Sequence, residues 1–174
     1  MKREMTAETL VGLYKDLEAV GLRIWIDGGW GVDALLRRQT RAHEDVDFVV
    51  EENDLAELVA LLRARGYDDI PRDDTRSWNF VLGDDAGSDV DLHVVVFDAQ
   101  GNGIYGPPEN GESYPAYSFG GRGRINGHEV LCMSVEFQVI NHTGYKPRDK
   151  DVQDMQVLCA EFGLEPPEEY VGLM

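Results

Sequence analysis

The hydrophobic positions of this chain follow two periodicities, one typical of helices and one typical of strands. After Thr6, apolar residues recur every three or four positions, at Leu10, Leu13, Tyr14 and Leu17. This spacing predicts an amphipathic helix that Thr6 caps and that Gly21 ends near residue 20. Similar patterns predict further helices at residues 29–37, 54–65 (capped by Asn53), 135–143 (capped by Ser134) and 149–162.

Shorter apolar or alternating stretches predict strands at residues 23–26, 45–50, 78–82, 90–97, 123–125 and 129–133. The last two form a hairpin around Asn126-Gly127, a dipeptide that favours a type I′ turn. Residues 98–118 are rich in Gly, Pro and Asn, which predicts a long loop with little regular structure. The last ten residues are expected to form a loosely packed tail.

These elements follow one another without strict β-α-β alternation. The order predicts an α+β fold, a mixed sheet flanked by helices with a helical C-terminal part. We expect a single domain over residues 1–174, in which residues 134–174 form a helical C-terminal extension. A chain of 174 residues is long enough to bury about two-thirds of the surface that it exposes when unfolded.

The composition narrows the range of partners and locations. The formal net charge of −17 disfavours nucleic acid, because phosphate contacts need clustered Lys and Arg. It would help to attract a cationic partner, although acids that only keep the protein soluble explain the same charge. No apolar run approaches the ~20 residues that span a bilayer, and the N-terminus lacks the apolar core of a signal peptide, so we expect a cytoplasmic protein without a membrane partner. The two cysteines, Cys132 and Cys159, are expected to be buried free thiols.

The most unusual polar positions lie in the stretch DGGWGVDALLRRQTRAHEDVDF, from Asp27 to Phe48. Asp45 and Asp47 stand one residue apart in a predicted strand, so both point to the same face. Two such carboxylates repel each other unless a cation lies between them, and Mg²⁺ prefers hard oxygen ligands and shares its shell with substrate phosphates. A solvent-facing edge strand would also tolerate the pair, so the spacing alone leaves both interpretations open.

The residues around the two acids favour the metal. Gly28 and Gly29 allow a sharp turn and a close approach to a ligand, and the helix that follows directs its N-terminal N–H groups at an anion. A third acid, Asp91, lies with His93 in the predicted strand DVDLHVVV, which could pair beside the first. Lys150, at the start of the last helix, offers a cation for a triphosphate. Together these features predict nucleotidyl transfer with two metal ions.

Several motifs of the sequence resemble those of a known family. The motifs GGW, HEDVDF and VDLH, together with CMSVEFQVINHTGY further along, are similar to those of the small nucleotidyltransferases of antibiotic resistance. The short lincosamide nucleotidyltransferases resemble the chain most, with the aminoglycoside 2″-adenylyltransferases as relatives. The similarity covers most of the chain, and residues 98–118 match only loosely.

The resemblance implies a polymerase-β-like nucleotidyltransferase fold and the transfer of NMP, with AMP favoured, from an NTP to a hydroxyl of a small molecule such as a lincosamide or an aminoglycoside. It assigns the metal and the catalysis to Asp45, Asp47 and Asp91. The expected cofactor is Mg²⁺, with ATP favoured as co-substrate. The residues expected to contact the nucleotide are Gly28, Gly29, Arg41, His43 and Lys150. For His43, and for Trp30 and Asp33 nearby, packing and hydrogen bonding inside the fold are the competing interpretation.

Two alternative functions stay open. A minimal nucleotidyltransferase of the toxin–antitoxin type would modify a protein, and a non-catalytic module would only bind nucleotide. The three acids argue against the second alternative, because binding alone does not need them. Acids in the loops that flank the predicted strand 78–82 could form an acidic wall near the metal site, which would favour a cationic acceptor, or they could be solvated turn acids. They are Asp68, Asp69, Asp73, Asp74, Asp84 and Asp85. The resemblance leaves both a monomer and a homodimer open.

Overall fold

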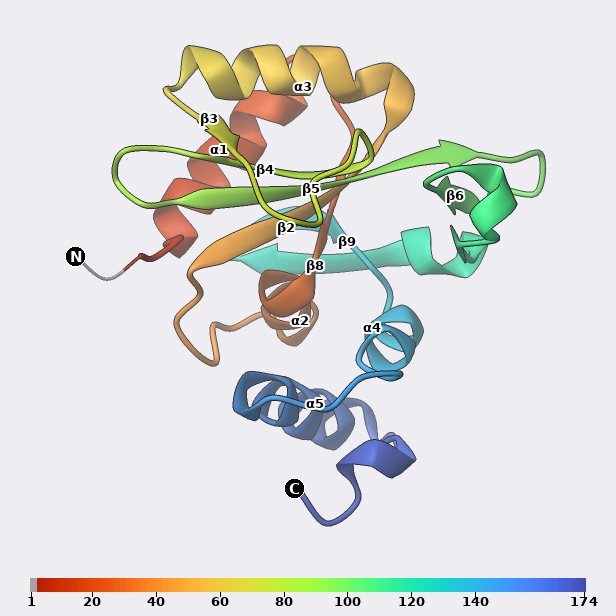
Figure 1. Ribbon diagram of the computed structural model, residues 1–174. Helices are drawn as coiled ribbons and strands as arrows, with labels where there is room; N and C mark the ends of the chain where they lie inside the picture. Colours follow the sequence, from red (N-terminus) through yellow and green to blue (C-terminus); the bar gives the residue numbers. More distant parts are fainter. Residues whose placement is uncertain (1–2) are drawn as a thin grey trace.

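The computed structural model describes residues 3–174, and its centre is a single mixed sheet (Figure 1). The strands follow the order β3-β4-β5-β2-β1-β9-β8, and β6 and β7 extend it beside the end of β5. Their bounds are β1 Ile24–Asp27, β2 Asp45–Glu51, β3 Asp68–Ile70, β4 Asn79–Gly83, β5 Asp89–Phe97, β6 Gly103–Tyr105, β7 Ser113–Tyr114, β8 Gly121–Ile125 and β9 His128–Cys132.

Helices cover both faces of this sheet (Figure 1). On one face lie α1 (Ala7–Ala19) and α3 (Glu52–Ala64), and on the other lie α2 (Gly28–Leu36), α4 (Val135–Asn141) and α5 (Asp149–Phe162). The main core forms under α1 and α3, where Val46 and Phe48 of β2 and Val90 and Leu92 of β5 are buried. The α+β fold with a mixed sheet, which we predicted from the sequence, is confirmed.

The pairing of β2 with its neighbours determines which side chains meet on the other face. β2 runs parallel to β5 and antiparallel to β1, with Asp47 opposite both Asp91 and Asp27. Because side chains alternate across a strand, burying Val46 and Phe48 on one face turns the aspartates of β2 to the other. The same register places Asp45 opposite Asp89.

The region between β5 and β8 differs from the loop that we expected. It contains β6 and β7 and two short 3₁₀ helices, η1 (Pro108–Asn110) and η2 (Ala116–Gly120). Asn102 organises this region, because its side chain donates to Asp98 at 3.0 Å and accepts from the backbone of Ala116 at 2.9 Å. High Gly and Pro content signalled the turns correctly, but the side-chain hydrogen bonds that order the backbone between them leave no periodic pattern.

Two smaller expectations are wrong, and one strand was not predicted. Helix α3 begins at Glu52 after the cap residue Glu51, so Asn53 is not its cap. The strand β3 was not predicted, because its three residues carry two exposed acids. The C-terminal tail is anchored, because Tyr170 in η3 (Glu168–Tyr170) is fully buried and its hydroxyl donates to the carbonyl of His142 at 2.7 Å.

Other local predictions are confirmed. Thr6 and Ser134 accept capping hydrogen bonds at the starts of α1 and α4. Asn126 and Gly127 both have positive φ, as a type I′ turn requires. Cys132 and Cys159 are buried free thiols.

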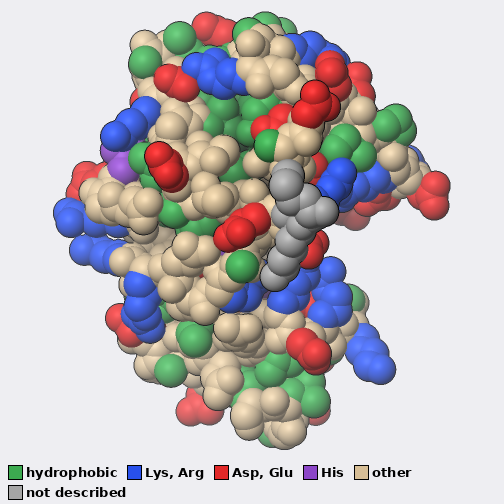
Figure 2. Space-filling view, turned by 90° about the vertical axis from the view of Figure 1, so that its left-hand side faces the viewer, with side chains coloured by type: hydrophobic (Ala, Val, Ile, Leu, Met, Phe, Trp, Pro, Cys, Tyr) green, Lys and Arg blue, Asp and Glu red, His purple; other side chains and the backbone are tan. Residues whose placement is uncertain are grey.

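The surface does not carry a single sign of charge despite the net charge of −17. Acidic and basic side chains both occur on the face shown in Figure 2. Among residues 3–174, no helix combines the length and the apolar character that crossing a membrane needs.

Candidate active site

Five aspartates from three strands meet on the sheet face that α2, α4 and α5 cover. Asp27, Asp47 and Asp91 form one cross-strand row, and Asp45 and Asp89 form the next. The two rows bring the three predicted metal ligands, Asp45, Asp47 and Asp91, to one wall of a cavity. Such a density of carboxylates on one sheet face is costly without a cation, because like charges raise one another's free energy.

The glycine turn fits closely against this row. Gly28, at the end of β1, has φ of 61°, and a Cβ on it would collide with the carboxylate of Asp47. A Cβ on Gly29 would collide with the side chains of Arg41 and His43. Gly28 is therefore required both by its backbone conformation and by the space that Asp47 occupies, whereas a side chain at Gly29 would have to displace Arg41 and His43.

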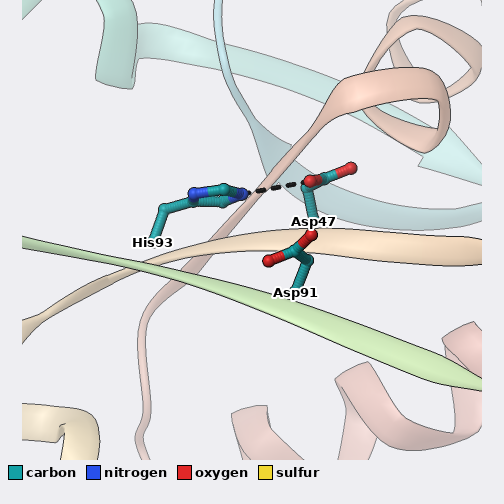
Figure 3. A group of neighbouring side chains, drawn as sticks. All are labelled: Asp47, Asp91 and His93. Carbon is teal, nitrogen blue, oxygen red and sulfur yellow. Dashed lines mark hydrogen bonds and ion pairs between the residues drawn. The ribbon is translucent and has the colours of Figure 1, made fainter. Parts of the chain in front are cut away.

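The tightest cluster of possible metal ligands consists of Asp47, Asp91 and His93 (Figure 3). One ligand atom from each lies within 4.8 Å of the other two. His93 Nε2 is 3.0 Å from Asp47 Oδ1, and His93 Nδ1 is 3.3 Å from the Tyr105 hydroxyl. Asp45 lines the same cavity but is not part of this cluster, so the three predicted ligands do not form one compact group.

The charges in the cluster shift one another's pKa values. Burial raises the pKa of Asp91 to about 6, against the attraction of His93 and with the repulsion of Asp47. Burial also raises the pKa of Asp45, and the nearby Asp47 adds to that effect. For His93, burial opposes the charged form, but the hydrogen bond to Asp47 and the surrounding carboxylates outweigh it and raise the pKa to about 9. The cluster thus favours positive charge at its centre.

The cavity above the sheet has a volume of about 430 Å³ and is lined by charges of both signs. The sheet side supplies Asp45, Asp47 and Asp91, and the start of α5 supplies Lys150 together with Arg148, whose guanidinium is paired with Asp151 at 2.9 Å. Basic groups opposite a row of metal-binding acids suit a metal-bound polyphosphate. The charged and histidine side chains that line the cavity are Arg41, His43, Glu44, Asp45, Asp47, Arg72, Asp91, His142, Arg148, Lys150, Asp151 and Asp154.

All five residues expected to contact the nucleotide line this cavity, but two of them are already engaged. Arg41 makes two hydrogen bonds of 2.7 Å with the carboxylate of Asp154, which ties the loop before β2 to α5. His43 is 3% exposed, and its Nε2 lies 2.6 Å from Asp33. This agrees with a structural role for His43 and Asp33.

Asp27 and Asp89 were not predicted as site residues, although the sequence around each contains a recognisable pattern. Asp27 directly precedes the glycine pair, and it is buried, with Gln138 donating to its Oδ1 at 2.9 Å. Asp89 belongs to a second Asp-Val-Asp tripeptide that repeats the one at Asp45. Burial raises the pKa of Asp27, with Asp47 contributing, and burial also raises that of Asp89.

Arg72 was also missed, because it lies in a loop with no pattern of its own. It is 3.6 Å from Asp89 and 3.7 Å from Asp91, and it lines the cavity. In contrast, Asp68 and Asp69 pair with Arg63 on the outer edge of the sheet, so they do not contribute to an acidic wall near the site.

Comparison with known proteins places this geometry in a family. Residues 9–158 match the family model described as aminoglycoside-2″-adenylyltransferase. The chain belongs to this family. Membership confirms the resemblance stated from the motifs, and it identifies the chain as a nucleotidyltransferase enzyme.

Individual relatives agree with the family model. A lincosamide resistance protein from Staphylococcus haemolyticus is 26% identical over 160 residues, which cover 91% of this chain and 98% of that protein. A 2″-aminoglycoside nucleotidyltransferase from Escherichia coli is 42% identical over 45 residues, or 26% of this chain and 25% of that protein.

Solved structures confirm the nucleotidyltransferase fold. Lincosamide antibiotic adenylyltransferase LnuA, bound to lincomycin, superposes with a TM-score of 0.79 and 24% identity, covering 90% of this chain and 98% of the other. ANT(2″)-Ia in complex with adenylyl-2″-tobramycin gives a TM-score of 0.70 and 21% identity, covering 90% and 89%.

Proposed function

We propose that this enzyme transfers AMP from ATP to a hydroxyl group of a small amine-bearing antibiotic, a lincosamide or an aminoglycoside, with two divalent cations. The observation that carries the proposal is the cavity in which Asp45, Asp47 and Asp91 face Arg148 and Lys150 across a glycine turn. In the reaction, the acceptor oxygen bonds to the α-phosphorus, the bond from that phosphorus to the bridging oxygen breaks, and pyrophosphate leaves.

The side chains present fit the divalent cations that this chemistry needs. Asp45 and Asp47 offer hard oxygen ligands on one face of β2, and Asp91 offers another from β5. Burial is the main cause that raises the pKa of Asp45 and of Asp91, with repulsion from Asp47 added, and a bound cation would oppose both effects. When bound, the cations neutralise the phosphates and polarise the transferring group.

Other residues of the chain bind the phosphates, accept the proton and position α5. Gly28 and Gly29 let the phosphates approach the first turn of α2, and Lys150 and Arg148 attract the charged end of the triphosphate. Asp91 accepts the proton of the acceptor hydroxyl. The ion pair of Arg41 with Asp154 holds α5 against the cavity, so residues 134–174 act within the same domain as the sheet.

The acceptor is inferred from the relatives and from charge. The relative that matches nearly its full length is a lincosamide resistance protein, and the chain's own family model is that of aminoglycoside-2″-adenylyltransferases. Both kinds of antibiotic carry amines and hydroxyls, and a protein of net charge −17 attracts cations. These observations favour a small antibiotic over a protein acceptor and over a role in nucleotide binding alone.

A direct test incubates the protein with Mg²⁺, each of the four NTPs and a panel of lincosamides and aminoglycosides. We expect stoichiometric pyrophosphate release and a product heavier by one AMP, with ATP as the best donor. Asp47→Asn serves as the inactive control. Absence of product and of pyrophosphate across the whole panel, from protein that binds ATP with Mg²⁺, would overturn the proposed acceptor class.

A further inference from the structure

His93 is held where it can bind a cation together with two carboxylates. Its Nε2 is 3.0 Å from Asp47 Oδ1, close to the separation of about 3 Å between adjacent ligands of an octahedral ion with bonds of about 2.1 Å. The ligand atoms of Asp47, Asp91 and His93 lie within 4.8 Å of one another, and opposite ligands of one ion are about 4.2 Å apart. A shift of a few tenths of an ångström, or ordinary rotamer adjustment, would therefore bring all three to one ion.

The other ring nitrogen of His93 has a hydrogen-bond partner of its own, as in most metal-binding histidines, although here the partner is a tyrosine hydroxyl. Nδ1 lies 3.3 Å from the Tyr105 hydroxyl and can donate to it, so an ion that displaces the proton which Nε2 shares with Asp47 meets a lone pair on Nε2. Tyr105 is itself fixed, because it stacks on Tyr114 with ring centroids 5.3 Å apart and belongs to β6, which pairs with β5. The imidazole is thus oriented before any ion binds.

Two different donor sets therefore meet at Asp47, one inside the cavity and one that includes His93, which lies beside Asp47 and Asp91 but does not line the cavity. On one side, Asp45 and Asp47 supply oxygen only, which suits Mg²⁺. On the other side, the donor set contains the imidazole nitrogen of His93 in addition to Asp47 and Asp91. A nitrogen ligand favours first-row transition ions over Mg²⁺. The view in Figure 3 shows the imidazole edge directed at Asp47, with Asp91 beside it.

We propose that His93 Nε2 is a metal ligand, and that the cation site of Asp47, Asp91 and His93 prefers a first-row transition ion such as Mn²⁺ to Mg²⁺. The proposal deepens the proposed function, since it concerns the identity of one of the two cations. The competing role for His93 is to hold Asp47 by a hydrogen bond without touching the ion.

Electron spin-echo spectroscopy on protein loaded with one equivalent of Mn²⁺ separates these roles, because it detects ¹⁴N nuclei bonded directly to the ion. We expect nitrogen coupling in the wild type and its loss in His93→Gln. His128→Gln is the matched control, because His128 pairs with Glu18 outside the cavity, and the coupling should persist there. Bound Mn²⁺ without nitrogen coupling in the wild type would overturn the proposal.

Metal binding alone supplies a second measurement. Titration calorimetry of Mn²⁺ and of Mg²⁺ gives a ratio of dissociation constants for each variant. We expect His93→Gln to weaken Mn²⁺ binding about tenfold or more and to change Mg²⁺ binding much less, which is the range of one lost ligand or ligand-orienting group. An unchanged ratio would show that His93 only positions Asp47. A different result would contradict the proposed function itself: in the same titrations with ATP present, neither Mn²⁺ nor Mg²⁺ would bind to the wild type.

Discussion

The chain uses the tripeptide Asp-Val-Asp twice, at the starts of β2 and β5, and the two copies lie side by side in register. In both copies the valine is buried in the core and the aspartates turn to the opposite face. Three of the four aspartates line the cavity, and Asp89 does not. Asp89 is only 3% exposed, and its Oδ2 accepts a hydrogen bond of 2.7 Å from Arg3.

The difference between Asp89 and Asp91 shows that sequence spacing sets the face of a side chain but not its role. Both residues belong to one strand and point to one face. Asp89 is paired at 2.7 Å with Arg3, from the segment that precedes α1, whereas Asp91 lines the cavity beside His93 and has an arginine, Arg72, only at 3.7 Å. A buried carboxylate with its own counter-ion is a structural group, and one that lacks a full counter-ion is available to a metal.

The largest expected effect follows from this contrast. Asp91→Asn should lower kcat/KM for AMP transfer by about a thousandfold or more, because it removes a metal ligand and the proton acceptor. Asp89→Asn makes the same chemical change two residues away and should retain activity to within about threefold. Initial rates of pyrophosphate release with a true acceptor measure both. Equal losses in the two variants would show that the two aspartates do not differ in role.

The glycine turn gives a second, smaller contrast. Gly28→Ala should cost about 1–2 kcal/mol of unfolding free energy from its positive φ, and it should also weaken binding of metal and ATP at least about tenfold, because the new methyl group displaces Asp47. Urea denaturation and calorimetry measure the two quantities.

Gly21→Ala is the matched control for the turn. Gly21 also has positive φ, but a Cβ there meets nothing within 4 Å. It should show a similar loss of stability with unchanged ligand affinity. If Gly28→Ala bound metal and ATP as the wild type does, the turn would be merely structural.

A third prediction concerns the cation opposite Asp45. Lys150 lines the cavity at the start of α5 and lowers the pKa of Asp45, against the larger opposing effect of burial. Lys150→Met should raise KM for ATP roughly three- to tenfold and leave kcat nearly unchanged, since an exposed lysine contributes binding rather than chemistry. Lys146→Met, outside the cavity, should change neither constant. A drop in kcat with constant KM would contradict a phosphate-binding role.

The helices, most strands and the acids of β2 could be predicted from the sequence, because periodicity and alternation are local properties. The sequence also indicated Asp91, since a strand beginning with Asp-Val-Asp invites comparison with the first. The resemblance selected Asp91 and not Asp89, but the sequence could not show why their roles differ, because Arg3, the partner of Asp89, lies 86 positions away. The same limit applies to Arg41, whose engagement with Asp154 spans 113 positions.

The smallest predicted effect concerns the stability of the metal-free protein. The pKa of Asp91 in the folded protein is about 6, above the ordinary value of 3.8, so folding favours its protonated form. As the pH rises from about 4 to above 6, Asp91 ionises in the folded state, where burial makes its charged form less favourable than in the unfolded chain. The free energy of unfolding therefore decreases over this pH range. Asp91→Asn does not ionise, so it escapes this loss. At pH 8 without metal, it should be more stable than the wild type by about 1 kcal/mol, or roughly 2–4 °C in Tm.

At pH 4 the advantage of Asp91→Asn should disappear, because the wild-type carboxyl is then protonated as well. Saturating Mn²⁺ or Mg²⁺ at pH 8 should reverse the order of stability, since ions that bind only the folded wild type stabilise it by mass action. Thermal denaturation of both proteins at the two pH values, with and without metal, measures all of these differences. A variant that is less stable than the wild type at pH 8 in the absence of metal would mean that Asp91, like Asp89, is a structural charge.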